Sequence, residues 1–184
     1  MRRKCRSMTF TKTVARDSEA VTVPQVCPAD LPRVSRARIG LIDVDNIVIG
    51  DDGLIQPDRA HAALAEVYAQ MSTVELSLAV VSDPARKALG PNLCFQFPRW
   101  TWRAAEVGKD AADRQLLDFA RAALRQRPGA LVAVASGDHG FAQLAELTDL
   151  EVVVPRTHHG VARELRQYLR VWRPAGQHDF GLAT

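Results

Sequence analysis

The stretch Ile39–Asn46, which reads IGLIDVDN, decides the fold of this chain. Its apolar first half is typical of a strand buried on both faces of a parallel sheet, and acidic residues follow it at once. A second such stretch, Leu131–Asp138, reads LVAVASGD. Between the two, Gly108–Asp113 opens a predicted helix. Because the carboxyl ends of parallel strands meet at one edge of a sheet, we expect the acidic residues of all three segments to converge there.

The rest of the chain alternates between strand-like and helix-like segments. Runs of apolar residues predict strands over 39–44, 76–81, 130–135 and 151–154, with a weaker strand over 93–97 and a loop or short extra strand over 100–106. Apolar residues at helical spacing predict helices over 59–71, 110–127, 141–147 and 161–172. This alternation predicts an α/β fold, a three-layer αβα domain with a mostly parallel central sheet of about five strands.

Charge and composition divide the 184 residues into one folded domain and two ends. Residues 1–38 hold nine Lys or Arg against three acidic residues, whereas the remainder holds fifteen basic and eighteen acidic residues. The lack of sustained periodicity predicts a disordered basic leader over 1–37, then the domain over 38–173 and a flexible tail over 174–184. The leader could neutralise nucleic-acid phosphates, although a merely solvated leader would have the same composition.

The remaining composition excludes several classes of protein. No apolar run approaches the ~20 residues that span a bilayer, and no apolar stretch follows the basic start as it would in a secretory signal. Cys5, Cys27 and Cys94 are too few and too widely spaced for a disulfide framework or a zinc site. We therefore expect a cytoplasmic protein. Homodimer formation is compatible with a domain of this size, but no motif requires it.

The acidic residues after the first strand are candidates for a functional site. Asp43 follows Leu41 and Ile42 directly, so its carboxylate should be partly enclosed and should need hydrogen bonds or a cation. Asp45 lies on the same face as Asp43 if the strand continues that far. Otherwise Asp45 and Asn46 would form a turn at the strand end.

Two further segments bring carboxylates toward the same edge. Asp138 follows the most apolar strand through Ser136 and Gly137, which allow a sharp turn with a polar lining. Asp110 and Asp113 occupy the first turn of a predicted helix, where Asp110 suits the cap position. Converging carboxylates repel one another, and a divalent cation is the usual remedy. This edge therefore predicts metal-dependent phosphate chemistry.

Three motifs, in this order, resemble those of the NYN domain, a branch of the PIN-like nucleases. Asp43–Asn46 matches D-x-x-N at a strand end, and Lys109–Asp113 matches K-x-x-x-D at a helix start. Ser136–Phe141 matches the strand-end motif S-G-D-x-D-F except at Gly140, where the family often has a second Asp. The resemblance covers roughly residues 38 to 171.

The resemblance implies an endonuclease that cleaves single-stranded RNA with Mg²⁺ or Mn²⁺, the metal polarising a phosphodiester and generating hydroxide from bound water. The implied site consists of three carboxylate metal ligands and two neutral groups that orient water or phosphate, namely Asp43, Asp113 and Asp138, and Asn46 and Ser136. The site is one carboxylate short if the family's second Asp is a ligand. Asp45 or Asp110 could then compensate, or the activity could be reduced or lost.

Two other functions remain open on the sequence. Asp43–Asn46 also resembles the first motif of haloacid-dehalogenase-type phosphatases, D-x-D-x-[TV], in which Asp43 would be the nucleophile and Asp45 the general acid. Ile47 at the Thr/Val position and Ala142 at the place of a later acid depart from that pattern. The other alternative is a catalytically degenerate domain of the NYN type that binds RNA or a partner protein without cutting.

Basic residues at three places are candidates for RNA contact. Lys109 lies next to the predicted acidic edge, where it could bind phosphate or balance the carboxylates. The last predicted helix carries arginines at three- and four-residue steps, Arg163, Arg166 and Arg170, although a solvated arginine face would look the same. Residues 98–103 alternate Trp with Arg, as in a single-strand binding surface or an edge strand with one buried face. Packing is the favoured interpretation for these tryptophans.

Overall fold

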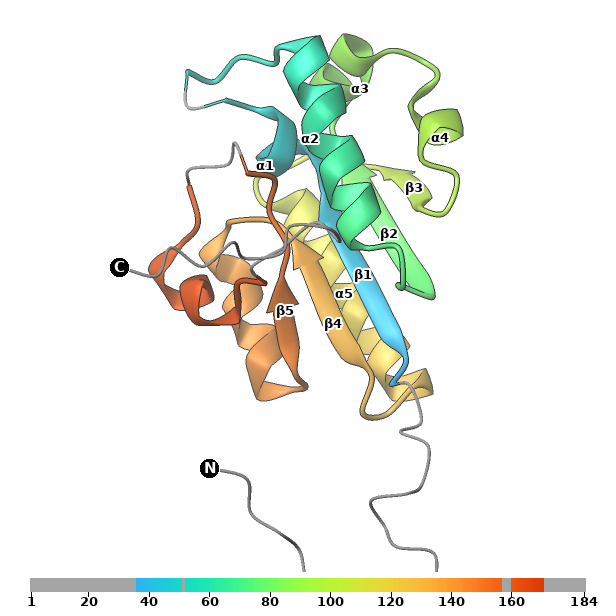
Figure 1. Cartoon of the computed structure of the whole chain (residues 1–184), viewed down its shortest axis with the longest axis vertical. Helices are drawn as coiled ribbons and strands as arrows, with labels where there is room; N and C mark the ends of the chain where they lie inside the picture. Colours follow the sequence, from blue (N-terminus) through green and yellow to red (C-terminus); the bar gives the residue numbers. More distant parts are fainter. Residues whose placement is uncertain (1–35, 51, 157–159, 171–184) are drawn as a thin grey trace, which may run out of the picture. The chain divides into compact units, whose positions relative to one another are not determined.

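Five parallel strands form the centre of the structure, a computed structural model that describes residues 36–50, 52–156 and 160–170 (Figure 1). The strands are β1 (Arg38–Asp43), β2 (Leu76–Val81), β3 (Thr101–Ala104), β4 (Leu131–Ala135) and β5 (Leu150–Val152). Their order across the sheet is β3-β2-β1-β4-β5, and every neighbouring pair is parallel. The predicted three-layer α/β architecture is confirmed.

Helices connect the strands and cover both faces of the sheet. They are α1 (Val44–Val48), α2 (Pro57–Gln70), α3 (Asp83–Leu89), α4 (Leu93–Gln96), α5 (Ala111–Gln126) and the 3-10 helices η1 (His139–Glu146) and η2 (Arg163–Tyr168). One face carries α1 to α4, and the other carries α5, η1 and η2 (Figure 1). No helix in the described ranges is long and apolar enough to cross a membrane. The predicted tail, and the predicted leader except residues 36–37, lie outside those ranges.

Each central strand buries both of its faces, as its unbroken apolar sequence predicts. In β1, Ile42 packs in the core beneath α2, and Leu41 packs in the core beneath α5. In β4, Ala133 packs in the same core as Ile42, and Val132 packs in the same core as Leu41. Removing a large aliphatic side chain from water contributes roughly 1.5–3 kcal/mol, so the two cores together hold the carboxyl edge of the sheet in a fixed position.

The helix α5 matters most for function because it carries Asp113. Its residues Leu116, Ala120 and Ala123 recur at steps of three or four and are buried against the second core. Charged residues occupy the opposite side of the helix, as expected of an amphipathic surface helix. This packing fixes the first turn of α5 close to the carboxyl end of β1.

The chain leaves the first strand earlier than predicted. Residues 44–48 form α1, so the strand does not reach Asp45, and the condition under which Asp43 and Asp45 would share a strand face is not met. The cause is local, because the Asp43 carboxylate caps the new helix by accepting a hydrogen bond from the backbone N–H of Asn46. The aspartate that ends the strand therefore begins the helix.

The prediction of a weak strand over 93–97 is wrong. Its apolar ends, Leu93 and Phe97, are buried, and the Phe97 backbone N–H donates to the Leu93 carbonyl in the single turn α4. The edge position beside β2 is taken by β3, which falls within the short extra strand allowed over 100–106. The pattern of apolar residues also does not predict α3, although Ser82 caps this helix and Pro84 lies in its first turn.

The two last predicted helices are 3-10 helices, and the final one is shorter than predicted. Instead of an α-helix over 161–172, the structure has η2, which ends at Tyr168. Leu165, fully buried, anchors η2 to the second core. Residues from 171 onward, including the predicted helix end at Trp172, lie outside the described ranges.

The tryptophans of residues 98–103 serve packing. Trp100 is buried, and its ring centroid lies 5.2 Å from those of Tyr68 and Phe97. Arg99 lies over the Tyr68 ring, 4.1 Å from the ring centroid. These contacts hold the α4–β3 segment against α2, and they confirm the packing interpretation for this cluster.

Gly40 is expected to be sensitive to substitution because the segment between α2 and β2, and β2 itself, approach it closely. A Cβ at this position would lie 2.9 Å from Val74 Cγ1 and 3.2 Å from Ser77 Cβ on the neighbouring strand. We expect Gly40→Ala to lower the free energy of unfolding by about 1–2 kcal/mol, since overpacking forces neighbours apart. Gly160→Ala is the control, because a Cβ there meets nothing within 4 Å. Urea unfolding that shows equal stabilities for the two variants would contradict this account.

Candidate functional site

The carboxyl ends of β1 and β4 lie side by side where the strand order reverses. From β1 the chain proceeds to β2 and β3 on one side, and then returns to form β4 and β5 on the other. In an open parallel sheet, such a reversal leaves a crevice at the carboxyl edge where ligands bind. Ile42 and Ala135 are register partners here. The two acidic segments selected from the sequence therefore leave the sheet at the position where open parallel sheets commonly bind ligands.

Asp43 is the most enclosed carboxylate at this edge, with 6% of its surface exposed. Its Oδ1 accepts a hydrogen bond from the Asn46 backbone N–H (3.3 Å), and its Oδ2 accepts one from the Ser136 hydroxyl (3.1 Å). The pKa of Asp43 is raised from 3.8 to about 7, chiefly by burial and further by repulsion from Asp113 and Asp45. The two hydrogen bonds oppose this shift without offsetting it.

Ser136 joins the ends of β1 and β4. It is fully buried, and its hydroxyl accepts a hydrogen bond from the Asp138 backbone N–H (3.1 Å) while donating to Asp43. A single hydroxyl thus fixes the Asp43 carboxylate relative to the turn that carries Asp138. Ser136 therefore links two of the three residues that the resemblance assigns to the metal, through the Asp43 carboxylate and the Asp138 backbone.

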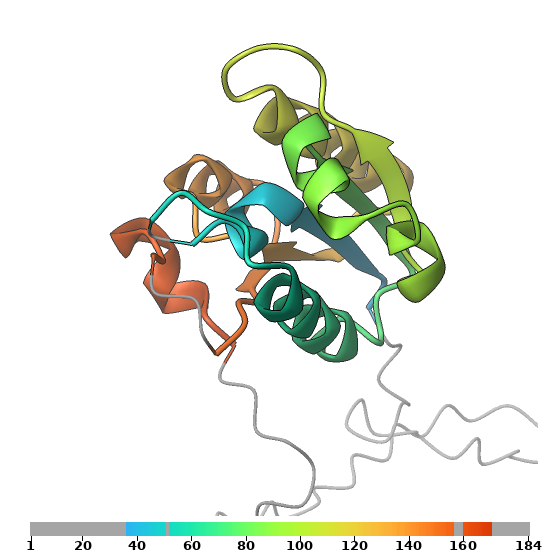
Figure 2. The same ribbon diagram turned by 90° about the horizontal axis from the view of Figure 1, so that it is seen from above.

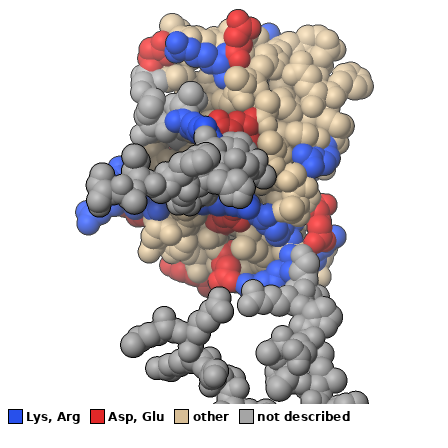
Figure 3. Space-filling view, in the orientation of Figure 1, with Lys and Arg blue, Asp and Glu red and all other residues tan. Residues whose placement is uncertain are grey.

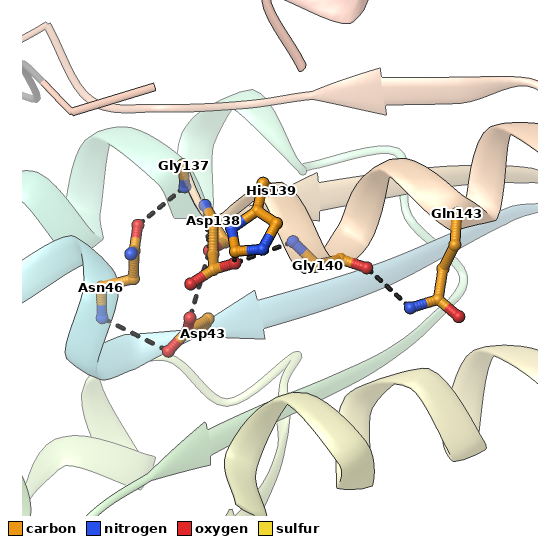
Figure 4. Close-up of polar contacts among 8 residues, drawn as sticks. Asp43, Asn46, Gly137, Asp138, His139, Gly140 and Gln143 are labelled. Atoms are coloured by element: carbon orange, nitrogen blue, oxygen red, sulfur yellow. Dashed lines mark hydrogen bonds and ion pairs between the residues drawn. The ribbon is translucent and has the colours of Figure 1, made fainter. Parts of the chain in front are cut away.

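Asn46 provides a second link between the same two segments. Its side-chain Oδ1 accepts a hydrogen bond from the Gly137 backbone N–H at 2.7 Å, and its own backbone N–H donates to Asp43 (Figure 4). Among the described residues, the side-chain Nδ2 of Asn46 donates no hydrogen bond. This amide group is therefore available to a ligand.

Asp138 caps η1 directly after the turn from β4. Its Oδ1 accepts a hydrogen bond from the Gly140 backbone N–H (2.8 Å) and lies 3.2 Å from His139 Nδ1 (Figure 4). Both contacts use Oδ1, and within the described part of the chain Oδ2 accepts no hydrogen bond. The side chain is 37% exposed, so a ligand can reach this carboxylate.

Gly140, at the position where the NYN motif often has a second Asp, holds Asp138 through its backbone. Its N–H donates to Asp138, and its carbonyl accepts a hydrogen bond from Gln143 Nε2 at 2.8 Å (Figure 4). A Cβ at position 140 would lie 3.3 Å from Asp138 Oδ1, which is a tight contact. Gly140 can hold Asp138 through its backbone N–H, but it lacks the negative charge that an Asp would carry at this position.

Asp113 approaches the edge from the first turn of α5. Its pKa is raised, first by partial burial and then by repulsion from Asp138 and Asp110. Asp113 in turn raises the pKa of Asp43. Asp113 therefore lies close enough to both of the other predicted ligands, Asp43 and Asp138, for their charges to repel.

The two carboxylates considered as substitutes lie close enough to repel predicted ligands, Asp45 acting on Asp43 and Asp110 on Asp113. The Oδ1 of Asp45 accepts a hydrogen bond from the Ser82 backbone N–H (3.0 Å), which ties α1 to the end of β2. Asp110 stands at the N-cap position of α5 but makes no capping hydrogen bond, because its backbone is left-handed with a φ of +55°. The predicted capping role of Asp110 is wrong, although its charge acts on Asp113.

The candidate RNA-binding residues lie at separate places. Arg163 and Arg166 are one 3-10 turn apart in η2 and share a side of it. Arg170 lies beyond η2, and its guanidinium pairs with Glu151 at 3.1 Å. Basic and acidic side chains are interspersed on the face drawn in Figure 3. Lys109 is exposed in the loop before α5, and RNA contact stays a prediction for all four basic residues.

The donor chemistry of the site fits a hard divalent cation. Within the described ranges, no three His, Cys, Asp or Glu side chains already lie together as a preformed metal site. A preformed set is not required by Mg²⁺, which keeps several waters and is usually bound through one or two carboxylates plus substrate phosphates. Asp43, Asp113 and Asp138 supply carboxylate oxygens; the pKa values of the first two are raised chiefly by burial and further by repulsion from other carboxylates, and a cation would favour their ionised forms.

Comparison with known proteins leaves the site to be interpreted from its own chemistry. No protein-family model, curated protein or solved structure matches this chain. The α/β fold class follows from the sheet itself. The resemblance to NYN domains rests on the three motifs and stays a prediction.

Two residues near the carboxylates were not selected from the sequence. His139 is 78% exposed and contacts Asp138, but it has no second histidine at ligand spacing. Gln115 lies two residues after Asp113 and binds the backbone of the loop before α5. Neither residue type stands out on a helix surface, so only the fold reveals these contacts.

Proposed function

We propose that this protein is a metal-dependent endoribonuclease that hydrolyses phosphodiester bonds in single-stranded RNA. The observation that carries the proposal is the group of carboxylates at the edge of β1 and β4, where burial and repulsion raise the pKa of Asp43 and of Asp113. Such a group needs a proton or a cation, and it lies where open parallel sheets bind ligands. The NYN-like motifs supply the choice of reaction.

Each residue of the site has a role in this proposal. Asp43, Asp113 and Asp138 would hold Mg²⁺ or Mn²⁺, which when bound polarises a phosphoryl oxygen and yields hydroxide from water at neutral pH. Ser136 keeps the Asp43 carboxylate aligned through its hydroxyl. The side-chain N–H₂ group of Asn46 would donate to a phosphate oxygen or to the attacking water.

Charge supports a nucleic-acid substrate. Lys109 is exposed in the loop that leads to Asp113, and Arg163 and Arg166 are exposed on η2. Residues 1–38 add a strongly basic segment. Such cations neutralise phosphates and release counterions, which favours binding of a polyanionic strand.

The cell compartment of the proposed reaction is inferred from the cysteine content. Three widely spaced cysteines suit a reducing compartment, so we place the reaction in the cytoplasm. Dimerisation stays a prediction that size alone permits.

Gly140 favours one alternative, a domain of the same fold that binds RNA or a partner protein without cutting. A site with one carboxylate fewer holds a divalent ion less tightly, because ligand charge sets affinity. The phosphatase alternative has less support. Its general acid would be Asp45, whose carboxylate already accepts the Ser82 backbone N–H at the end of β2.

The first test compares two substitutions on the same helix. Asp113→Asn removes a charge from the proposed site, whereas Asp118→Asn removes one from a side chain of α5 that is 76% exposed. We expect the wild type and Asp118→Asn to bind Mn²⁺ in calorimetry and to cut single-stranded RNA. Asp113→Asn should bind Mn²⁺ at least about tenfold more weakly, with a matching loss of cleavage.

Three other outcomes would change the proposal. Equal metal binding by the two variants would remove Asp113 from the site. A wild-type protein that binds RNA but neither binds Mn²⁺ nor cuts would point to the non-catalytic alternative. Hydrolysis of p-nitrophenyl phosphate without cleavage of RNA would point to the phosphatase.

A further inference from the structure

The loop between β3 and α5, residues 105–110, stands clear of the sheet and the helices (Figure 2). Val107, near its middle, is fully exposed. Gly108 and Asp110 have φ values of +133° and +55°, so the loop reaches the first turn of α5 through two unusual backbone conformations. A branched aliphatic side chain in this position contributes nothing to either core.

Two neighbours of Asp113 fasten the loop to α5. The side chain of Gln115 accepts a hydrogen bond from the Glu106 backbone N–H (3.1 Å) and donates to the Ala104 carbonyl (3.4 Å). The guanidinium of Arg114 donates to the Lys109 carbonyl at 2.7 Å. The loop is therefore held at both ends by the helix turn that carries the proposed metal ligand.

The same contacts decide which side chains of the loop remain for a ligand. Gln115 Nε2 also donates to the Glu106 carboxylate at 3.4 Å, so the one acidic side chain between β3 and Lys109 is tied to the helix. Val107 and Lys109 stay exposed, and within the described ranges their side chains make no hydrogen bond or ion pair. A fixed loop thus presents one apolar group and one cation beside the carboxylate edge, with the exposed Asp110 carboxylate directly after them.

An apolar group next to a cation matches the repeating unit of a single nucleic-acid strand. Unpaired bases offer flat apolar faces on which side chains pack, and each base is joined to a phosphate. In a duplex the bases are stacked and paired, so a side chain like that of Val107 has no base face to contact. The loop chemistry therefore favours a single strand over a double one.

We propose that the β3–α5 loop is the surface that receives the single-stranded RNA, with Val107 packing on a base and Lys109 pairing with an adjacent phosphate. Gln115 and Arg114 act as positioning residues that hold the loop in place. The choice of RNA rests on the proposed function. The loop would guide the strand toward Asp113 and would select against duplexes.

The test measures RNA binding without cleavage, using the full chain in EDTA and a fluorescein-labelled single-stranded RNA oligonucleotide followed by anisotropy. We expect Val107→Asp to weaken binding at least about tenfold, because it places a negative charge against the strand. Lys109→Ala should weaken binding, and the slope of log Kd against log salt concentration should fall by about one. A duplex of the same sequence should bind the wild type more weakly, and Val107→Asp should change its affinity less.

Leu147→Asp and Arg125→Ala are the matched controls, since both residues are exposed near the opposite end of the domain. Circular dichroism verifies that each variant is folded. Wild-type affinity in Val107→Asp and Lys109→Ala would overturn the inference even if the protein cuts RNA. Weaker binding in these two variants, with no metal-dependent cutting by the wild type, would support the inference and reject the nuclease. A wild type that binds no RNA would overturn it and leave the loop to a protein partner.

Discussion

Replacing Asp43 with Asn should abolish metal-dependent cleavage of single-stranded RNA while leaving the fold intact. Asn has nearly the same shape: its Oδ1 can still accept a hydrogen bond from the Asn46 backbone N–H, while its Nδ2 would donate to the Ser136 hydroxyl oxygen in place of accepting from that hydroxyl. It lacks the negative charge that binds a divalent cation. Because a metal contributes several kcal/mol of charge stabilisation in the transition state, the rate should fall at least about 100-fold.

Asp45→Asn is the matched control for this variant. Asp45 lies two residues further along, and its Oδ1 accepts the Ser82 backbone N–H, a bond that an Asn oxygen can also accept. We expect this variant to cut RNA at close to the wild-type rate. Cleavage time courses in excess Mn²⁺, together with circular dichroism of each protein, make the comparison.

The two variants also separate the enzyme classes. A phosphatase would use Asp43 as nucleophile and Asp45 as general acid, so both substitutions would abolish its activity. Of these two residues, the proposed nuclease needs only Asp43. An Asp43→Asn variant that cuts RNA as fast as the wild type would contradict the assignment of the site.

The central strands are predictable from the sequence because burial on both faces demands an unbroken apolar run. Leu41 and Ile42 face opposite cores, and a polar side chain in place of either would be buried against the helices that cover that face. The edge strand β3 has no such signal, since most of its side chains are exposed. The apolar segment 93–97 has a stronger signal but a spacing of four between Leu93 and Phe97, which a single helical turn satisfies.

The candidate site is predictable where topology alone brings residues together. Ile42 and Ala135 are register partners, so the residues that follow them, Asp43 and Ser136, must meet at the edge. The position of Asp45 is different, because it depends on where β1 stops. One hydrogen bond to the Asp43 carboxylate decides that point, and residue patterns cannot weigh a helix cap against one more strand residue.

Contacts made by long side chains could not be predicted. Gln115 binds the loop before α5, yet a glutamine on an exposed helix carries no signal of such a role. Arg170 shares a helix side with the other predicted arginines, Arg163 and Arg166, only if the last helix continues past Tyr168. The 3-10 helix η2 ends there, and Arg170 turns to Glu151 instead.

The metal-free protein should contain a carboxyl group whose contribution lowers stability as the pH rises. The pKa of Asp43 is raised from 3.8 to about 7 by the fold, chiefly through burial. Below the lower value the group is protonated in both states, so the fold pays no penalty. Between the two values the unfolded chain releases its proton first and is favoured, and above about 7 the full penalty of about 4 kcal/mol is reached. Asp113, whose pKa is also raised, acts in the same direction.

Comparing the wild type with Asp43→Asn isolates this contribution from that of the other titrating groups. In urea unfolding with EDTA, the wild type should lose roughly 2–3 kcal/mol more than the variant between pH 5 and pH 8. Mn²⁺ added at the higher pH should stabilise the wild type and not the variant, because the cation binds the ionised carboxylates of the folded state only. Stabilities that change in parallel with pH would contradict the raised pKa of Asp43, and with it the argument that this edge of the sheet needs a cation.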